Sequence, residues 1–177
     1  MVELVAFTEE DIDTLIQWIP SEPFLYQWGG HSFTYPLTYE QLEQYVEGAN
    51  QEGAVKYIYK ALDSSTGDVM GHVSIARVDW INESGRIGRV LIGDKRYLGK
   101  GYGQDIVKQA TRIAFEELGL HRVSLGVFNF NVSAKKAYEK VGFVQEGTLR
   151  DARKFGEEYW TLIEMSMLRE EWEQVST

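Results

Sequence analysis

The glycine-rich segment Arg96 to Gly103, with the sequence Arg-Tyr-Leu-Gly-Lys-Gly-Tyr-Gly, constrains this chain more than any other feature. It follows an apolar run, 87–92, that predicts a strand, and it precedes a run, 104–118, that predicts a helix. Glycine permits the backbone conformations of a tight curl, and the positive end of the helix dipole begins where the curl ends. Because such a curl turns backbone N–H groups inward, the segment predicts a site for a phosphate or pyrophosphate group.

The charge around this segment favours a specific anionic ligand. Lys95, Arg96 and Lys100 place positive charge on a chain whose formal net charge is -9. The pattern is not a P-loop, because it lacks the Gly-Lys-Ser/Thr ending. Nor is it the dinucleotide fingerprint, because Ile106 stands where the third glycine is required. A turn that only connects a strand to a helix is the alternative interpretation.

Composition indicates one globular domain spanning 1–177, with 44% hydrophobic residues to form its core. The chain has no cysteine, so disulfides and thiolate metal sites are excluded, and a cytoplasmic location is expected. Neither a signal peptide nor a membrane-spanning run is expected. The acidic balance argues against nucleic acid as a partner, and it is compatible with a cationic substrate such as an amine.

The order of predicted elements is that of a mixed α/β protein. Thr8 and Asp11 predict a capped helix that Pro20 and Pro23 end, and Thr38 predicts the start of a second helix that extends to about residue 50. The aromatic stretch between these helices, 21–37, is expected to be irregular. The remaining pattern predicts strands at 4–7, 56–62, 69–80, 86–92, 122–128, 144–150 and 159–168, and helices at 104–118 and 131–141.

A second motif occupies 131–143, with the sequence Asn-Val-Ser-Ala-Lys-Lys-Ala-Tyr-Glu-Lys-Val-Gly-Phe. An amphipathic helix that ends at Gly142 would by itself explain the spacing. Together with Arg-x-x-Gly-x-Gly, one helix and one strand earlier, it resembles the GNAT acetyltransferase superfamily. The resemblance covers about 55–168. Its tail looks like the branch of ribosomal-protein N-terminal acetyltransferases, although Trp160 stands near the position where that branch often has an acidic residue.

The resemblance implies a single GNAT-like domain of the α/β (α+β) class. Its mixed, mostly antiparallel and twisted sheet would have about seven strands flanked by helices, with two splayed central strands, here 89–92 and 125–128. The segment 1–54 would form a helical and aromatic region on the acceptor side. The segment 55–168 would form the acyl-CoA-binding core.

The implied reaction is direct transfer of an acetyl group from acetyl-CoA to a primary amine, either a protein N-terminus or a small amine. The backbones of Arg89 and Leu91 would hold the pantetheine arm, and the Leu91 N–H would polarise the acetyl carbonyl. Arg96 would help the loop backbone to bind the pyrophosphate, and Asn131 would touch the pantetheine or phosphate region. The loop residues involved are Leu98, Gly99, Lys100, Gly101, Tyr102 and Gly103.

Tyr138 is the candidate general acid that returns a proton to the CoA thiolate, with an ordinary core tyrosine as the alternative. The general base is open, because some relatives place a glutamate where this chain has Gly126. Glu83 is the first candidate, and Asp79, His72 and His31 are others, although each could also be an ordinary turn, strand or loop residue. His121 is expected to be structural. No His and carboxylate pair has metal-ligand spacing, so no metal is expected.

The aromatic stretch supplies a candidate acceptor wall of Trp28, His31, Phe33 and Tyr35, with Gly29 and Gly30 allowing it to flex. The alternative is that these side chains only cover the sheet. Two other functions remain open at this stage, a non-catalytic acyl-CoA-binding sensor and a nucleotide-binding regulator. A homodimer is possible, because dimers are common on this fold.

Overall fold

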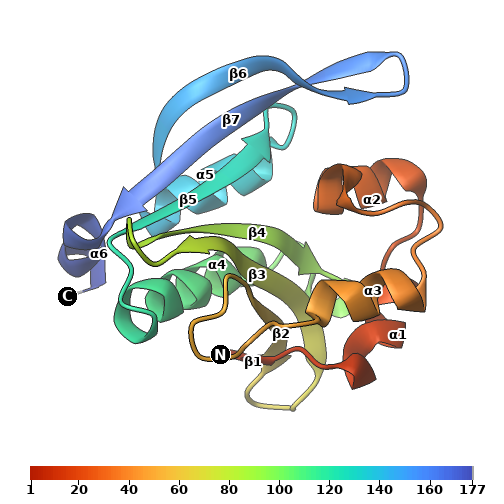
Figure 1. The fold of residues 1–177 in the computed structure, drawn as a ribbon, viewed down its shortest axis with the longest axis horizontal. Helices are drawn as coiled ribbons and strands as arrows, with labels where there is room; N and C mark the ends of the chain where they lie inside the picture. The colour runs from red at the N-terminus through yellow and green to blue at the C-terminus, as the bar shows by residue number, and fades with distance from the viewer. Residues whose placement is uncertain (177) are drawn as a thin grey trace.

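The computed structural model describes residues 1–176, which are built on one seven-stranded sheet with the strand order β1-β2-β3-β4-β5-β7-β6. All neighbouring strands are antiparallel except β4 and β5, which are parallel. The strands are β1 (Val2–Ala6), β2 (Tyr57–Asp63), β3 (Val69–Asp79), β4 (Ser84–Ile92), β5 (Arg122–Phe128), β6 (Val144–Phe155) and β7 (Glu158–Leu168). Figure 1 shows the long β6–β7 hairpin extending beyond the rest of the sheet toward helix α2.

The two parallel strands separate after a short paired stretch. They pair only at Ser84 with Arg122, Gly85 with Val123, and Arg86 with Ser124. Beyond Arg86, β4 continues along β3, whereas β5 continues along β7. This divergence confirms the expected splay, and it leaves a gap in the ladder at the centre of the sheet.

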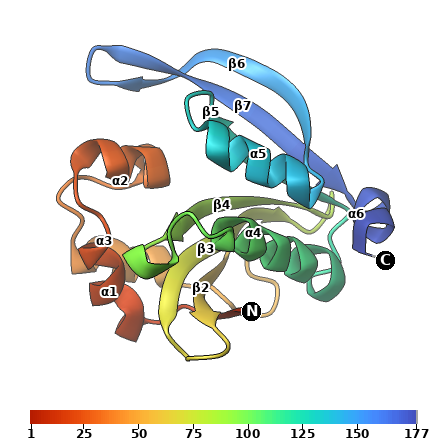
Figure 2. The same ribbon diagram turned by 180° about the vertical axis from the view of Figure 1, so that it is seen from behind.

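Helices cover the two faces of the sheet differently. Helices α4 (Tyr102–Arg112) and α5 (Val132–Val141) lie side by side on one face (Figure 2), and the larger hydrophobic core lies beneath them. The opposite face of β2 to β4 is covered by α1 (Ile12–Gln17), α2 (Glu22–Gly29) and α3 (Tyr39–Val46), which enclose a second core with Ile58 and Leu91. The gap between β4 and β5 therefore lies between two separately packed layers.

Most of the predicted elements are present, but the aromatic stretch is more ordered than expected. The Ser21 hydroxyl accepts a hydrogen bond from the Phe24 N–H at 3.4 Å and caps helix α2. Pro23 lies in the first turn of this helix, where a missing N–H costs nothing, so it helps to start a helix there. The prediction that 21–37 is irregular is therefore wrong for 22–29.

Other differences concern where elements end. A π-helical turn (Ile113–Glu117) continues α4, and α3 ends at Val46, before the expected position. A C-terminal helix, α6 (Arg169–Ser176), is present although no pattern predicted it. It is held by Trp172, which stacks on Phe115 and donates its indole N–H to Glu116 at 2.9 Å. These are tertiary contacts, so local sequence spacing does not reveal them.

Candidate active site

A cleft of about 570 Å³ occupies the gap between β4 and β5. It is lined by α2 and β3 on one side of the sheet, by the separated parts of β4 and β5, and by α5 and the start of α4 on the other. The cleft is therefore accessible from both layers, and each layer contributes different chemistry to it.

The glycine segment forms a curl that leads into α4. Gly99 and Gly101 have positive φ angles of 71° and 87°, in the left-handed region that favours glycine. Gly101 is the N-cap residue, and no side chain accepts a hydrogen bond there. Leu98 and Gly103 line the cleft, and Gly99, Lys100, Gly101 and Tyr102 lie between them on the same curl. The start of α4 thus offers backbone N–H groups and the positive dipole end to an anion.

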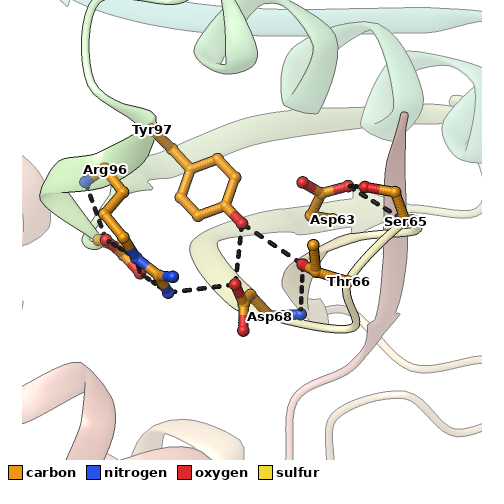
Figure 3. Close-up of polar contacts among 7 residues, drawn as sticks. Asp63, Ser65, Thr66, Asp68, Arg96 and Tyr97 are labelled. Carbon is orange, nitrogen blue, oxygen red and sulfur yellow. Dashed lines mark hydrogen bonds and ion pairs between the residues drawn. The ribbon is translucent and has the colours of Figure 1, made fainter.

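In the structure the side chain of Arg96 is paired with two carboxylates, whereas the sequence predicted that it binds the pyrophosphate. Its guanidinium is 2.7 Å from the Asp94 carboxylate and 3.2 Å from that of Asp68, and the hydroxyl of Tyr97 donates to Asp68 (Figure 3). The hydrogen bonds that Arg96 donates to the Asp94 carboxylate raise the pKa of Arg96, so it stays charged in this network. Arg96 does not line the cleft. Its ion pairs with Asp94 and Asp68 connect the start of the curl to the β2–β3 turn.

Strand β4 contains a bulge at Arg89, whose φ angle is 51°. The Arg89 carbonyl oxygen accepts hydrogen bonds from Trp28 Nε1 at 2.9 Å and from His72 Nδ1 at 2.8 Å. This oxygen therefore faces the α1–α3 layer and is already bonded to two donors. The pantetheine contact predicted for the Arg89 backbone cannot use it as a free acceptor.

The ladder beyond the bulge also corrects the prediction for Leu91. The Gly93 N–H donates to the Met70 carbonyl at 2.9 Å, so Gly93 and Met70 form a hydrogen-bonded pair. Leu91, two residues before Gly93, lies opposite His72 in the same ladder. Hydrogen-bonded pairs recur at every second residue of an antiparallel ladder, so the backbone groups of Leu91 point toward β3. Those of Val90 and Ile92, which line the cleft, point toward the open side. The Leu91 side chain is buried in the core beneath α1–α3.

His72 is a positioning residue for this bulge. It is fully buried, with the rings of Phe7 and Trp28 packed edge-on against it. Burial lowers its pKa to about 4, so the imidazole is neutral at pH 7, with Nδ1 donating to Arg89. Nε2 is then the acceptor, and it lies 3.4 Å from the Tyr45 hydroxyl. His72 does not line the cleft, so its geometry does not fit the alternative role of base.

Tyr138 and Asn131 reach the cleft from α5. Tyr138 lines the cleft, and burial raises its pKa to about 12, so the phenol keeps its proton at neutral pH. That protonation state is the one a general acid needs. Asn131 also lines the cleft, and its side-chain oxygen accepts from the Ala134 N–H at 3.3 Å, which caps α5. The spacing between Asn131 and Ala134 therefore has a structural purpose as well.

The presence of glycine at position 126 has a steric explanation that the sequence did not reveal. A Cβ atom at this position would lie 2.5 Å from Nη2 of Arg86 and 3.2 Å from Leu162. The Arg86 guanidinium crosses over β5 there and binds both oxygens of Glu164, at 2.7 and 2.8 Å. Glu164 lies directly opposite Gly126 on β7. The carboxylate opposite the expected base position is therefore that of Glu164, and an arginine already binds both of its oxygens.

The predicted acceptor residues separate into two groups. Trp28 and His31 line the cleft, and Phe33 stacks on Trp28 with 5.5 Å between ring centroids. Tyr35 is 42% exposed, and its hydroxyl lies 3.5 Å from the Pro20 carbonyl, outside the cleft. Glu83 is also remote. Its carbonyl accepts from the N–H groups of His121 and Arg122, at the end where β4 and β5 are still paired, so its side chain is not placed to act as the base.

An aromatic cluster that was not predicted connects α2 to the β6–β7 hairpin. The Tyr26 hydroxyl donates to the Lys154 carbonyl at 2.8 Å, and its ring packs on Phe155 and Trp160. Trp160 also packs edge-on against Phe128 and Phe130. The aromatic residue at 160 is thus explained by packing, and Tyr26 and Phe128 of this cluster line the cleft.

The side chain of Arg89 turns toward the α1–α3 layer. Its guanidinium lies over the rings of Phe33 and Tyr45, 5.2 and 4.8 Å from their centroids. Its Nε is buried and has no hydrogen-bond acceptor, and no carboxylate within residues 1–176 forms an ion pair with it. The charged side chains that line the cleft are Arg77, Arg86, Arg89 and Arg153, and the described lining includes no aspartate or glutamate. The cleft therefore has the opposite charge from the chain as a whole.

The comparison with protein families identifies the class of protein. The model of the acetyltransferase (GNAT) domain matches residues 2–144. The chain therefore belongs to the GNAT acetyltransferase family, and it is an acetyl-CoA-dependent N-acetyltransferase. This confirms the family resemblance and the predicted co-substrate.

Individual relatives differ in the acceptors that their names state. The chain is 31% identical to a putative ribosomal N-acetyltransferase, YdaF of Bacillus subtilis, over 107 residues, 60% of this chain and 57% of the relative. It is 27% identical to aminoglycoside N(6')-acetyltransferase type 1 of Klebsiella pneumoniae over 154 residues, 84% of this chain and 76% of the relative. The similarity to YdaF is the support for the finer prediction of the ribosomal-protein branch, which stays a prediction.

A solved structure confirms the fold. Spermidine N-acetyltransferase from Vibrio cholerae, in complex with CoA and spermine, has a TM-score of 0.83 to this chain at 20% identity, covering 97% of each chain. The predicted single GNAT-like α/β domain with its seven-stranded mixed sheet is therefore correct.

Two further properties of the described residues bear on partners. No group of three or more His, Cys, Asp or Glu side chains within residues 1–176 could hold a metal ion. Over the same residues, no helix has the length and apolar character to cross a membrane.

Proposed function

We propose that the acceptor of this acetyltransferase is the primary amine of a small molecule or of a peptide N-terminus, and that it enters from the α2 side of the cleft. The observation that carries this proposal is that the cleft opens to both layers of the sheet. The glycine curl and α5 bound one side. Aromatic side chains of α2 and the residues after it bound the other, which suits a flat-walled pocket for an organic amine.

The co-substrate fits the first side. Acetyl-CoA supplies a thioester whose acetyl group is transferred. The uncapped start of α4 and Lys100 suit its pyrophosphate, as do the loop residues Gly99 to Gly103. Val90 and Ile92 offer backbone groups along an unpaired strand edge, which an extended pantetheine arm can join as an added strand.

The chemistry then follows from groups at the centre of the cleft. A backbone N–H of β4 that faces the open side polarises the acetyl carbonyl. Such a donor typically contributes about 3–4 kcal/mol of transition-state stabilisation. Tyr138 returns a proton to the departing thiolate, because its pKa of about 12 keeps the phenol protonated at neutral pH.

The proton of the acceptor amine leaves through solvent. The described lining of the cleft includes no carboxylate, and Glu164 is held by Arg86. A free alkyl amine has a pKa near 10, so about one molecule in a thousand is neutral at pH 7. The rate at subsaturating acceptor is therefore expected to rise with pH toward the pKa of the amine.

The test is release of free thiol from acetyl-CoA with a panel of amines that includes peptides, amino acids, spermidine and an aminoglycoside. We expect Tyr138→Phe to lower kcat about 10²- to 10⁴-fold, since it removes one general acid, while acetyl-CoA binding is retained. Tyr59→Phe is the matched control, because burial also raises the pKa of Tyr59 to about 12 but this residue lies outside the cleft.

Two outcomes would contradict the proposal. Acetyl-CoA binding without thiol release for any amine would favour the non-catalytic sensor. Equal activity of Tyr138→Phe and Tyr59→Phe would remove Tyr138 from the mechanism. A homodimer and a cytoplasmic location stay predictions, and sedimentation analysis and cell fractionation would check them.

A further inference from the structure

We propose that the acceptor amine carries a carboxylate and that Arg89 binds this carboxylate in the cleft. The inference rests on the proposed function and narrows its substrate class. It starts from an unusual feature of Arg89. This arginine lines the cleft with a buried Nε that has no acceptor, and no carboxylate within residues 1–176 forms an ion pair with it. A buried donor without a partner is costly, so a missing acceptor is the first explanation to test.

The position of Arg89 assigns it to the acceptor and not to the co-substrate. Its guanidinium lies over the rings of Phe33 and Tyr45, in the layer opposite α4 and the glycine curl. The co-substrate phosphates would lie at the start of α4, on the other face of the sheet. Arg89 therefore faces the side from which the amine enters.

The structure also holds Arg89 in place before any ligand is bound. Trp28 and His72 fix its backbone carbonyl from the same layer. Two aromatic rings then cover its guanidinium, which limits the rotamers of the side chain. A planar guanidinium that is already positioned loses little entropy when it forms paired hydrogen bonds, and its geometry matches that of a carboxylate.

The charge of the cleft supports an anionic acceptor over a polycation. Arg86 is satisfied by both oxygens of Glu164, and Arg153 donates to the carbonyl of Ala152 at 2.8 Å. Arg89 shares a hydrogen bond with the Tyr45 side chain, but its buried Nε has no acceptor and no carboxylate within residues 1–176 pairs with it. The described lining contributes no carboxylate that could bind a second ammonium group. The acidic composition, which is compatible with a cationic acceptor, therefore does not extend to the lining of the cleft. A net charge of -9 belongs to the rest of the surface.

The experiment compares acceptors that differ only in the carboxylate. ω-Amino acids of increasing length are assayed by thiol release against their carboxamides, and peptides with N-terminal Asp or Glu against Asn or Gln. Spermidine is the polycationic comparison. We expect kcat/KM to favour the acid over its amide by about ten- to a hundredfold at the best length, the range typical of one charged hydrogen-bonded contact.

Variants of Arg89 separate recognition from folding and from catalysis. Arg89→Gln is expected to abolish the preference, so that kcat/KM for the acid falls to the value for its amide, while acetyl-CoA affinity stays within a few-fold. Arg89→Lys is expected to keep part of the preference, because it retains charge but not the planar fork. The matched control is Arg112→Gln on the exposed side of α4, which removes one positive charge remote from the cleft.

The outcomes distinguish the inference from the function on which it rests. Thiol release that is equal for acids and amides, or greatest for spermidine, would overturn the inference and leave the acetyltransferase proposal intact. An acid preference that Arg89→Gln retains would also overturn it. Acetyl-CoA binding with no thiol release in the whole panel would overturn both. Calorimetry gives a readout that does not depend on turnover. It compares the affinity of the protein for the N-acetylated acid with its affinity for the corresponding N-acetylated amide, and we expect the acid to bind more tightly.

Discussion

At the scale of single residues, the site depends on a neutral histidine that holds a strained strand. His72 and Trp28 both donate to the carbonyl of Arg89, whose positive φ angle would otherwise be unfavourable for a residue with a Cβ. The sequence indicated that His72 lies in a strand, and it left a role as base open. The structure gives it a different role, because its ring is enclosed by aromatic side chains and does not reach the cleft.

This burial predicts how stability depends on pH. The pKa of His72 is about 4 in the folded protein and about 6.5 when it is exposed. Between these two pH values the unfolded chain binds a proton that the folded chain does not bind. Stability is therefore lost as the pH falls from about 6.5 to 4, by up to about 3 kcal/mol. Urea unfolding at pH 7 and at pH 4.5 would measure this loss.

Variants assign the loss to one side chain. His72→Gln is expected to be less stable at pH 7 but to depend less on pH, since the titrating group is absent. His31→Gln, at an exposed position, is expected to keep the full dependence of the parent protein. An unchanged slope in His72→Gln would show that other groups are responsible.

At the scale of elements, the strand, curl and helix around 87–112 are the part that local sequence predicted well. The φ angles at Gly99 and Gly101 are positive, which explains why glycine occupies these two positions, and α4 starts at Tyr102. The partner of Arg96 was not predictable in the same way. Its carboxylates come from Asp94 within the segment and from Asp68 on another turn, and only folding brings Asp68 near (Figure 3).

The curl can be tested with a pair of glycine substitutions. Gly101→Ala forces a Cβ into the left-handed region, at a cost of about 1–2 kcal/mol, and disturbs the N–H groups at the start of α4. We expect acetyl-CoA affinity, measured by calorimetry, to fall about tenfold or more, since a loss of about 1.4 kcal/mol corresponds to a factor of ten.

Gly156→Ala is the control for strain alone. Gly156 also has a positive φ angle, 58°, and an added Cβ would meet nothing within 4 Å in the β6–β7 turn. It should lose similar stability and keep its acetyl-CoA affinity. Equal affinities in the two variants would contradict the role of the curl.

At the scale of the whole molecule, the sheet stays one unit although its central strands separate. The ion pair between Arg86 and Glu164 connects β4 to β7 across β5, beside the point where pairing ends. Gly126 leaves the space for it. The long β6–β7 hairpin reaches back to α2, where its Lys154 carbonyl and Trp160 ring contact Tyr26, so this end of the sheet is connected to the α1–α3 layer (Figure 1).

Substitution of Gly126 tests this connection. Gly126→Ala places a Cβ 2.5 Å from the Arg86 guanidinium, so the ion pair must shift, and we expect a loss of about 1–3 kcal/mol in urea unfolding. Gly147→Ala, where an added Cβ meets nothing within 4 Å, should change stability much less. Combining Gly126→Ala with Arg86→Met should cost less than the sum of the two single changes, because the clash is then relieved. Additive losses would contradict this account.

The sequence by itself determined the elements whose signals are local. The glycine curl, the amphipathic helix that carries Tyr138 and the alternation of strands follow from short spacings, and these spacings also carried the family resemblance. Only the tertiary structure decided which side chains meet in the cleft. Trp28 binds a carbonyl 61 residues away, and Arg86 binds a carboxylate 78 residues away. Such contacts depend on how strands are paired and where β4 and β5 separate, and these are properties of the packed sheet that no local spacing encodes.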